Sequence, residues 1–266
     1  MAGFVEINDP ADERLDDYRA LRTSGRPTET DSGAFLCEGI RGVERLLDSD
    51  MVIRSVLVTS TKLDRLGSRL ADRDVTVLVA SQEVLNATVG FNIHRGVIAS
   101  ALRRPSMAVH DLLSGFGTVA ALEGINDHEN LGAIFRSALA LGIDGVILDS
   151  ACGDPYYRRV VRVSMGAAFT LPFARIVAPA DLVDVLDGAA FASIALTPDP
   201  TALPIDRLVL AEGERPALLL GAEGDGLRRE TLERATYRVR IPIREGVDSL
   251  NVGHAAAVAF HRFGSV

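Results

Sequence analysis

Six short apolar segments between residues 118 and 243 constrain the fold of the chain more than any other feature. Each consists largely of Val, Ile, Leu, Ala and Phe, and segments with the amphipathic spacing of helices separate several of them. Near-continuous apolar strands that alternate with helices are typical of a parallel sheet covered on both faces, which predicts an α/β fold. The expected strands span residues 118–125, 145–150, 169–176, 191–197, 216–222 and 237–243.

In the first part of the chain, strand-like and helix-like segments also alternate, and these segments are shorter. Helical spacing at Leu15, Tyr18 and Leu21 predicts a helix, and a polar loop with Gly and Pro follows it. Pro105 and the glycines near residue 115 interrupt the pattern and mark a boundary. Further helices are expected at 35–50 and 82–90, and strands at 53–60, 75–81 and 95–103.

These patterns predict two α/β domains of unequal size. The larger is the parallel-sheet domain, and the smaller precedes it. The predicted organisation is a helical N-terminal extension at 1–30, the smaller domain at 31–105, a linker at 106–116 and the larger domain at 117–266.

Composition excludes several classes of protein. The 266 residues are 47% hydrophobic, which suffices for buried cores. No apolar run is long enough to span a membrane, and the N-terminus is too polar for a secretory signal, so a cytoplasmic location without a membrane partner is expected. Cys37 and Cys152 belong to no CxxC or Cys/His cluster, so we expect reduced, buried thiols and no metal site.

The net charge limits how the chain can contact nucleic acid. A formal charge of −8 argues against a surface that grips nucleic acid nonspecifically. A local basic patch remains compatible with it, and the segments "YYRRVVRVS" and "LRRPS" are candidates. Each can equally be an ordinary solvated surface.

Three polar, glycine-containing stretches of the larger domain follow predicted strands. They are "INDHENLGAIFRSALALG", "LLLGAEGDGL" and "IPIREGVDSLNVGHAAAVAF". Open α/β sheets bind ligands at such strand-to-helix junctions. Taken singly, each stretch has an ordinary explanation: Asn130 as a cap, the glycines as a tight turn and Ser249 as the cap of the last helix.

In order and spacing, the three stretches resemble the motifs of a known enzyme family. N-x-G-x-x-x-R-x-A-x-x-x-G, L-G-x-E-x-x-G-L and I-P-I-x(5)-S-L-N-V resemble the three motifs of the SpoU (TrmH-like) branch of the SPOUT RNA methyltransferases. The resemblance covers most of residues 117–266. It implies a deep trefoil knot, S-adenosylmethionine as cofactor, methyl transfer to an RNA ribose 2′-hydroxyl, and a homodimer. Residues 31–105 resemble, less closely, a ribosomal-protein-like domain that binds the RNA substrate.

The resemblance also implies roles for individual residues. Arg136 and Arg162 would contact the RNA substrate, and Gly253 departs from the serine common at that position in the family. The catalytic residues would be Asn130, Arg136, Glu223, Ser249 and Asn251. The cofactor would contact Leu220, Gly221, Ala222, Glu223, Gly224, Ile241, Pro242, Ile243, Leu250, Asn251 and Val252.

The proton acceptor is the difficult step of this chemistry. In the family the arginine of the first motif is the proposed base, but a guanidinium keeps its proton below about pH 12. We therefore hypothesise that Arg136 acts together with the adjacent RNA phosphate.

Two other readings of the sequence compete with methyl transfer to RNA. One is a noncatalytic RNA-binding or ribosome-assembly protein that retains the fold. The other is an α/β enzyme for a small molecule, which lacks a GxGxxG fingerprint, a GxSxG elbow or a metal cluster to support it. The separate first domain favours ribosomal RNA over transfer RNA as the partner.

Overall fold

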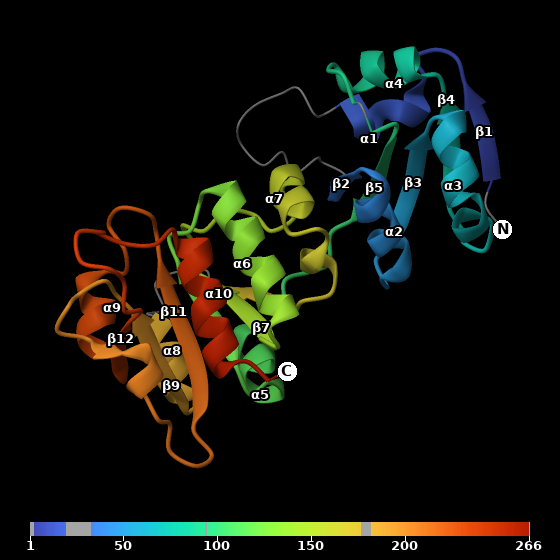
Figure 1. Cartoon of the computed structure of the whole chain (residues 1–266). Helices are drawn as coiled ribbons and strands as arrows, with labels where there is room; N and C mark the ends of the chain where they lie inside the picture. Colours follow the sequence, from blue (N-terminus) through green and yellow to red (C-terminus); the bar gives the residue numbers. More distant parts are fainter. Residues whose placement is uncertain (1–2, 20–32, 94, 177–181, 266) are drawn as a thin grey trace. The chain divides into compact units, whose positions relative to one another are not determined.

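The computed structural model describes residues 3–19, 33–93, 95–176 and 182–265. These residues form two compact units (Figure 1). Unit 1 comprises Met1–Arg104 with Tyr156–Phe169, and unit 2 comprises Pro105–Pro155 with Thr170–Val266. Within the described ranges, every helix is too short or too polar to cross a bilayer.

Unit 1 is built on a mixed sheet with helices beside it. The described strands form a five-stranded sheet in the order β1-β4-β3-β5-β2, in which β1, β4 and β3 are parallel and β5 is antiparallel to both of its neighbours. The strands are β1 (Gly3–Ile7), β2 (Ala34–Glu38), β3 (Ile53–Val58), β4 (Thr76–Ala80) and β5 (Val97–Leu102). The main helices are α2 (Ile40–Asp48), α3 (Ser60–Ala71), α4 (Gln82–Val89) and α7 (Arg158–Val163).

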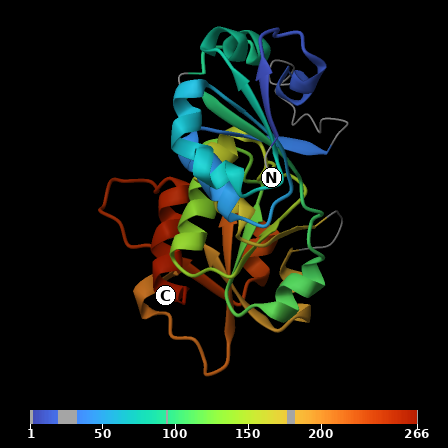
Figure 2. The ribbon, with the colours of Figure 1, turned by 90° about the vertical axis from the view of Figure 1, so that its right-hand side faces the viewer.

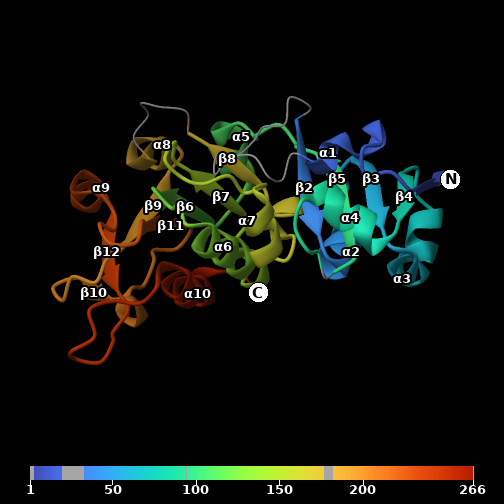
Figure 3. The same ribbon diagram turned by 90° about the horizontal axis from the view of Figure 1, so that it is seen from above.

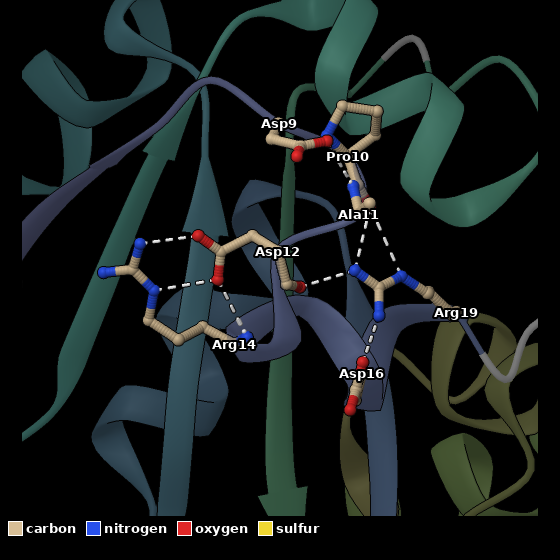
Figure 4. Close-up of polar contacts among 7 residues, drawn as sticks. All are labelled: Asp9, Pro10, Ala11, Asp12, Arg14, Asp16 and Arg19. Carbon is tan, nitrogen blue, oxygen red and sulfur yellow. Dashed lines mark hydrogen bonds and ion pairs between the residues drawn. The ribbon is translucent and has the colours of Figure 1, made fainter.

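The N-terminus of unit 1 differs from the expected helical extension. Residues 3–7 form β1 and pair in register with residues 76–80, and only Glu13–Leu15 (η1) and Asp16–Arg19 (α1) are helical. Local polar contacts fix this short turn, including an ion pair of 2.6 Å from Arg14 to Asp12 and a hydrogen bond of 2.9 Å from Arg19 to the Pro10 carbonyl (Figure 4). Leu21 and the polar loop that was expected after it lie outside the described residues.

The helix expected at 35–50 begins later than predicted. Residues 34–38 are the buried strand β2, and α2 starts at Ile40. Gly39 separates the two with a φ of 85°, a conformation that glycine adopts readily and other residues rarely adopt. The apolar run before Gly39 therefore belongs to the sheet, whereas the sequence analysis joined it to the helix.

Unit 2 has the predicted parallel sheet. Its described strands form a seven-stranded sheet in the order β10-β12-β9-β11-β6-β7-β8, and every pairing is parallel. They are β6 (Val119–Glu123), β7 (Gly145–Leu148), β8 (Phe173–Arg175), β9 (Phe191–Leu196), β10 (Leu203–Pro204), β11 (Arg215–Gly221) and β12 (Tyr237–Arg240). The α/β fold class is thus confirmed.

Helices cover both faces of this sheet. Helices α5 (Val109–Gly115) and α8 (Leu182–Gly188) lie on one face, and α6 (His128–Ala140) and α10 (Val252–Phe263) lie on the other (Figure 3). The view in Figure 2 again shows α10 beside α6, in agreement with the contacts between them. A further short helix, α9 (Arg229–Arg234), precedes β12.

The segment expected to be a linker is part of the unit 2 core. Residues 109–115 form α5, and Leu112 and Leu113 are buried among the sheet side chains Val119, Ile147 and Ala217. The glycines that indicated a linker lie at the end of this helix. The break in the sequence pattern therefore marks a short helix between strands.

Candidate active site

The carboxyl ends of three parallel strands of unit 2 border one cavity. These strands are β9, β11 and β12, and the loop that leads into α10 completes the wall. The cavity volume is about 500 Å³, which is in the range of small-molecule sites, roughly 300–1,000 Å³. Its lining consists of residues 196–198, 200, 220–224, 226, 240–241, 243–245, 247–252 and 255.

About half of this wall consists of residues that were predicted from the sequence. Every residue predicted to contact the cofactor lines the cavity except Pro242, which is exposed. Residues 196–198, at and just after the end of β9, and Arg240 also line the cavity but were not predicted to do so. The proline-rich "LTPDP" that follows the apolar strand was the available signal, but only the pairing of β9 with β11 places it at this cavity.

Asn251 joins the three motif stretches at the side of the cavity. Its Nδ2 donates hydrogen bonds of 2.8 Å to Asn130 Oδ1 on α6 and of 2.8 Å to Glu223 Oε1 after β11. Its Oδ1 accepts from the backbone N–H groups of Gly253 at 2.9 Å and His254 at 3.3 Å. The amide of Asn251 therefore uses both donors and both acceptor positions, so its orientation is fixed.

The expectation that Ser249 caps the last helix is wrong. Asn251 is the N-cap of α10, and Ser249 lies two residues earlier in the exposed loop, where it lines the cavity. Asparagine is as strong an N-cap residue as serine. The hydroxyl of Ser249 remains available for a ligand instead.

Asn130 occupies the first turn of α6 and is held from two sides. The cap of this helix is Asp127, whose Oδ1 accepts from the N–H groups of Glu129 and Asn130, each at 2.9 Å. The side chain of Asn130 is buried, with 6% of the residue exposed. The bond from Asn251 therefore satisfies an acceptor that little water can reach.

The two arginines predicted to contact substrate do not line the cavity. Arg136 is on the same helix as Asn130 and is exposed. Arg162 belongs to α7 of unit 1, where its Nη1 lies 3.4 Å from Glu38 Oε1. The structure thus gathers Asn130, Glu223 and Asn251 and places Ser249 on the same wall.

Two glycines of the motifs lie at close packing contacts, and of these two contacts only the one at Gly221 is prohibitive for a side chain. A Cβ on Gly221 would lie 2.1 Å from the Gly226 backbone, which folds back through the hydrogen bond of 3.1 Å from the Gly226 N–H to the Ala222 carbonyl. A Cβ on Gly253 would lie 3.1 Å from Ala133 Cβ. The glycine in place of the usual serine therefore lets α10 approach α6 closely.

A buried carboxylate that the sequence analysis overlooked supports the same loop. Glu123, at the end of β6, is 4% exposed and accepts from Thr231 Oγ1 at 2.6 Å and from the Arg228 guanidinium at 3.1 Å. It also accepts from the Arg228 backbone N–H at the start of α9. These bonds fix the start of α9, which is the end of the loop that begins at Gly221.

Comparison with known proteins gives consistent results. Residues 117–261 match the model of the SpoU rRNA Methylase family. The chain is 42% identical over 260 residues to an uncharacterized tRNA/rRNA methyltransferase of Mycobacterium bovis, covering 96% of this chain and 90% of that protein. It is 32% identical to the 23S rRNA (guanosine-2′-O-)-methyltransferase RlmB of a Burkholderia species, over 71% of this chain and 76% of that protein.

A solved structure resembles the whole chain. It is the AdoMet-bound rRNA methyltransferase from Sinorhizobium meliloti, with a TM-score of 0.82, 25% sequence identity and coverage of 97% of each chain. Sequence and fold therefore agree on one family.

Proposed function

This chain belongs to the SpoU rRNA methylase family, and on that premise we propose that it methylates a ribose 2′-hydroxyl of ribosomal RNA. The activity class is that of an S-adenosylmethionine-dependent RNA methyltransferase. Ribosomal RNA is favoured over transfer RNA because the Burkholderia and Sinorhizobium proteins are named as rRNA methyltransferases. The single observation that carries the proposal is the Asn251 network, which joins all three motif stretches beside one cavity.

The cavity fits S-adenosylmethionine in size and in the chemistry of its wall. Apolar side chains such as Leu220 and Ile241 suit the adenine ring, and the carboxylates of Glu223 and Asp248 suit the cationic groups of the cofactor. Arg240 suits its carboxylate, because the Arg240 Nε is buried without a hydrogen-bond partner. When bound, the cofactor supplies a sulfonium methyl group, which is a strong electrophile.

The residues of the chain then have to position a hydroxyl and manage one proton. Asn251 links the start of α10 to α6 and to the loop that contains Glu223. These links fix the side of the cavity where we propose that methyl transfer occurs. In our proposal Ser249 orients the ribose, and Asn251 acts indirectly by fixing the wall that carries Ser249. Arg136 stabilises the developing negative charge on the ribose oxygen while the adjacent RNA phosphate takes the proton.

We also propose that unit 2 is knotted. The Asn251 bonds bring the segment after β12 against both α6 and the loop after β11, and the Ser265 N–H then donates to the Gly142 carbonyl at 3.2 Å. A segment that passes through the loop formed by residues 221–228 would make these contacts. Tracing the chain in a crystal structure tests this proposal, and a trace that closes without a trefoil refutes it.

A homodimer is the proposed assembly. Leu139 on α6 is 42% exposed and Val258 on α10 is 41% exposed, although these two helices pack on one another. A second copy of the chain that covers the α10 face would bury Val258. Sedimentation should give a dimer for the natural chain and a monomer for Val258→Glu, and a natural chain that sediments as a monomer refutes the assignment.

The cytoplasm is the proposed location, because ribosomal RNA is there. Unit 1 is the proposed RNA-binding domain. All of the predicted domain at 31–105 except Pro105 falls in this unit, which also includes residues 156–169.

The decisive experiment for the proposed function is transfer of labelled methyl groups. Unmodified 23S rRNA and, separately, tRNA are incubated with the full chain and labelled S-adenosylmethionine and then hydrolysed in alkali, which 2′-O-methylated linkages resist. Label in one resistant dinucleotide of 23S rRNA is the expected result. Label in tRNA alone would move the substrate to tRNA, and cofactor binding without transfer to either RNA would favour the noncatalytic reading.

A further inference from the structure

Unit 1 contains a group of charged and aromatic side chains around Arg162, a residue that the family resemblance assigned to substrate contact. Glu38 at the end of β2 pairs with Arg158 Nη1 at 3.2 Å and with Arg162 Nη1 at 3.4 Å. The Arg158 guanidinium also lies over the Phe91 ring, 4.6 Å from its centre. Together with Arg95, these residues are called the Glu38 cluster below.

Arg95 belongs to the cluster through Gly39. A Cβ on Gly39 would lie 2.9 Å from Arg95 Cδ and 3.1 Å from Arg95 Nη1, so the Arg95 side chain covers the glycine that follows Glu38. Two guanidinium groups therefore contact the Glu38 carboxylate, one of them also lies over the Phe91 ring, and the Arg95 side chain lies against the next residue, Gly39.

The cluster presents positive charge to solvent. The Glu38 side chain is only 10% exposed, whereas the side chains of Arg158 and Arg162 are 34% and 43% exposed. Glu38 contacts one nitrogen of each guanidinium, and each guanidinium carries five N–H donors. The negative charge is thus covered while donors on two aligned arginines remain accessible.

The distribution of charge along the chain agrees with an anionic partner for unit 1. Residues 1–104 and 156–169 contain 17 basic and 16 acidic residues, whereas the rest of the chain contains 11 basic and 20 acidic residues. The segment 156–169 contributes three arginines and no acidic residue. The net negative charge of the protein therefore lies in unit 2, and unit 1 repels a polyanion less than unit 2 does.

We propose that the Glu38 cluster binds a single-stranded segment of the RNA substrate, an inference that rests on the proposed function. Arg95 and Arg162 pair with phosphate groups, and the Arg158 guanidinium, which lies over Phe91, stacks with an unpaired base on its accessible side. Glu38 is a positioning residue: its carboxylate aligns Arg158 and Arg162, which are one helical turn apart on α7.

Binding of unmodified 23S rRNA to the full chain, measured over a range of salt concentrations without cofactor, tests the surface. Arg95→Ala and Arg158→Ala should each weaken binding about 3- to 10-fold. Arg95→Ala should also lower the salt slope by about 0.7, the value for one lost phosphate contact, whereas Arg158→Ala, which removes a stacking group, should leave the slope nearly unchanged. Single-stranded poly(U) should compete better than an RNA duplex. Arg69→Ala is the matched control, because Arg69 pairs with Asp48 at the far end of α2 and is 47% exposed; it should bind like the natural chain.

Glu38→Gln separates positioning from simple attraction. Removing a negative charge from a surface that binds phosphate should tighten binding if only net charge matters. If Glu38 aligns the arginines, binding should instead weaken about 3-fold, by analogy with the loss of one hydrogen-bonded contact. Tighter binding by Glu38→Gln refutes the positioning role.

Folding and catalysis are checked separately so that the two proposals can fail independently. Each variant should keep the melting temperature and the S-adenosylhomocysteine affinity of the natural chain. If the natural chain methylates 23S rRNA and both arginine variants bind that RNA normally, the Glu38 cluster is not the RNA site and the proposed function stands. If the natural chain binds this RNA through the cluster but transfers no methyl group, the surface stands and the proposed function fails.

Discussion

Asn251 Nδ2 and Asn130 Oδ1 are 2.8 Å apart, although 121 positions separate the two residues in sequence. This bond links the start of α10 to the first turn of α6, and a second bond of 2.8 Å links Asn251 to Glu223. One side chain thus joins three segments, while its oxygen caps α10. Asn251 therefore supports both the fold of unit 2 and the wall of the cavity.

Replacing Asn251 should therefore affect stability and cofactor binding by different amounts. Asn251→Ala removes the cap and leaves the buried Asn130 oxygen without its donor, which should cost about 2–4 kcal/mol in urea unfolding. Asn251→Asp keeps the capping oxygen but removes the donor and places a charge beside Glu223. It should lose less stability than the alanine variant and yet weaken S-adenosylhomocysteine binding at least tenfold in calorimetry. Equal affinity for Asn251→Asp and the natural chain would contradict the role of this network in the cavity wall.

Arg240 should distinguish cofactor analogues by their carboxylate. It lines the cavity and its Nε is buried without a partner, so an anionic group is the ligand it suits. Arg240→Gln should weaken binding of S-adenosylhomocysteine about 10-fold, consistent with loss of a charge-assisted hydrogen bond of roughly 1.5–3 kcal/mol. Binding of 5′-methylthioadenosine, which lacks the amino-acid moiety, should change little. A loss of the same size for both ligands would show that Arg240 does not recognise the carboxylate.

Arg136 should be needed for transfer and not for cofactor binding. It is exposed on α6 and does not line the cavity. Arg136→Ala should lower the transfer rate at least 100-fold, in the range of an electrostatic contribution at a reacting oxygen, and leave S-adenosylhomocysteine affinity unchanged. Arg136→Lys separates the possible roles, because a lysine keeps a positive charge but not the guanidinium geometry. Near-full turnover by the lysine variant would reduce Arg136 to a positioning charge, and full activity of the alanine variant would remove it from the site.

The sequence predicted the central strands β6, β7, β9 and β11 well because they are buried on both faces. The strand expected at 169–176 is only Phe173–Arg175, and β10 was not predicted. An uninterrupted apolar run such as 216–222 has few alternatives to a central strand, and β11 does lie in the middle of its sheet. The same reasoning misassigned residues 34–38, because an apolar run directly before a helix has the composition of either element. The edge strand β1 was missed because only Ile7 is buried among its five residues.

Only the part of the candidate site that belongs to the three sequence motifs could be predicted. Asn130, Glu223 and Asn251 stand out through their order and spacing, and the structure brings their side chains together. Thr197 and Arg240 line the cavity because of the order of the strands that carry them. Strand order in a parallel sheet is set by tertiary packing and not by any local sequence pattern. Glu123 was missed for a related reason, since its partners Arg228 and Thr231 are distant in sequence.

Both cysteines should be unreactive in the folded chain. Cys37 and Cys152 are buried and free, and burial raises the pKa of both thiols, that of Cys152 to about 12. Because the thiolate is the reactive form, Cys152 at about pH 8 should hold about a thousand times less of it than an unperturbed thiol. Alkylation by iodoacetamide, followed by mass spectrometry, should modify neither cysteine natively and both in denaturant. Rapid native modification of Cys152 would show that its surroundings open to solvent.

Glu123 should matter more for stability than its single charge suggests. Its carboxylate accepts from Thr231 and from the backbone and side chain of Arg228, and it is almost fully buried. Glu123→Gln keeps the volume but faces these donors with an amide nitrogen, so unfolding should become easier by about 2–4 kcal/mol. Glu230→Gln, at an exposed position in the first turn of α9, is the matched control and should change stability by less than about 0.5 kcal/mol. If urea unfolding gives the two variants the same midpoint, the bonds to Glu123 do not hold the start of α9, and the loop beside the cavity must be supported by its backbone contacts alone.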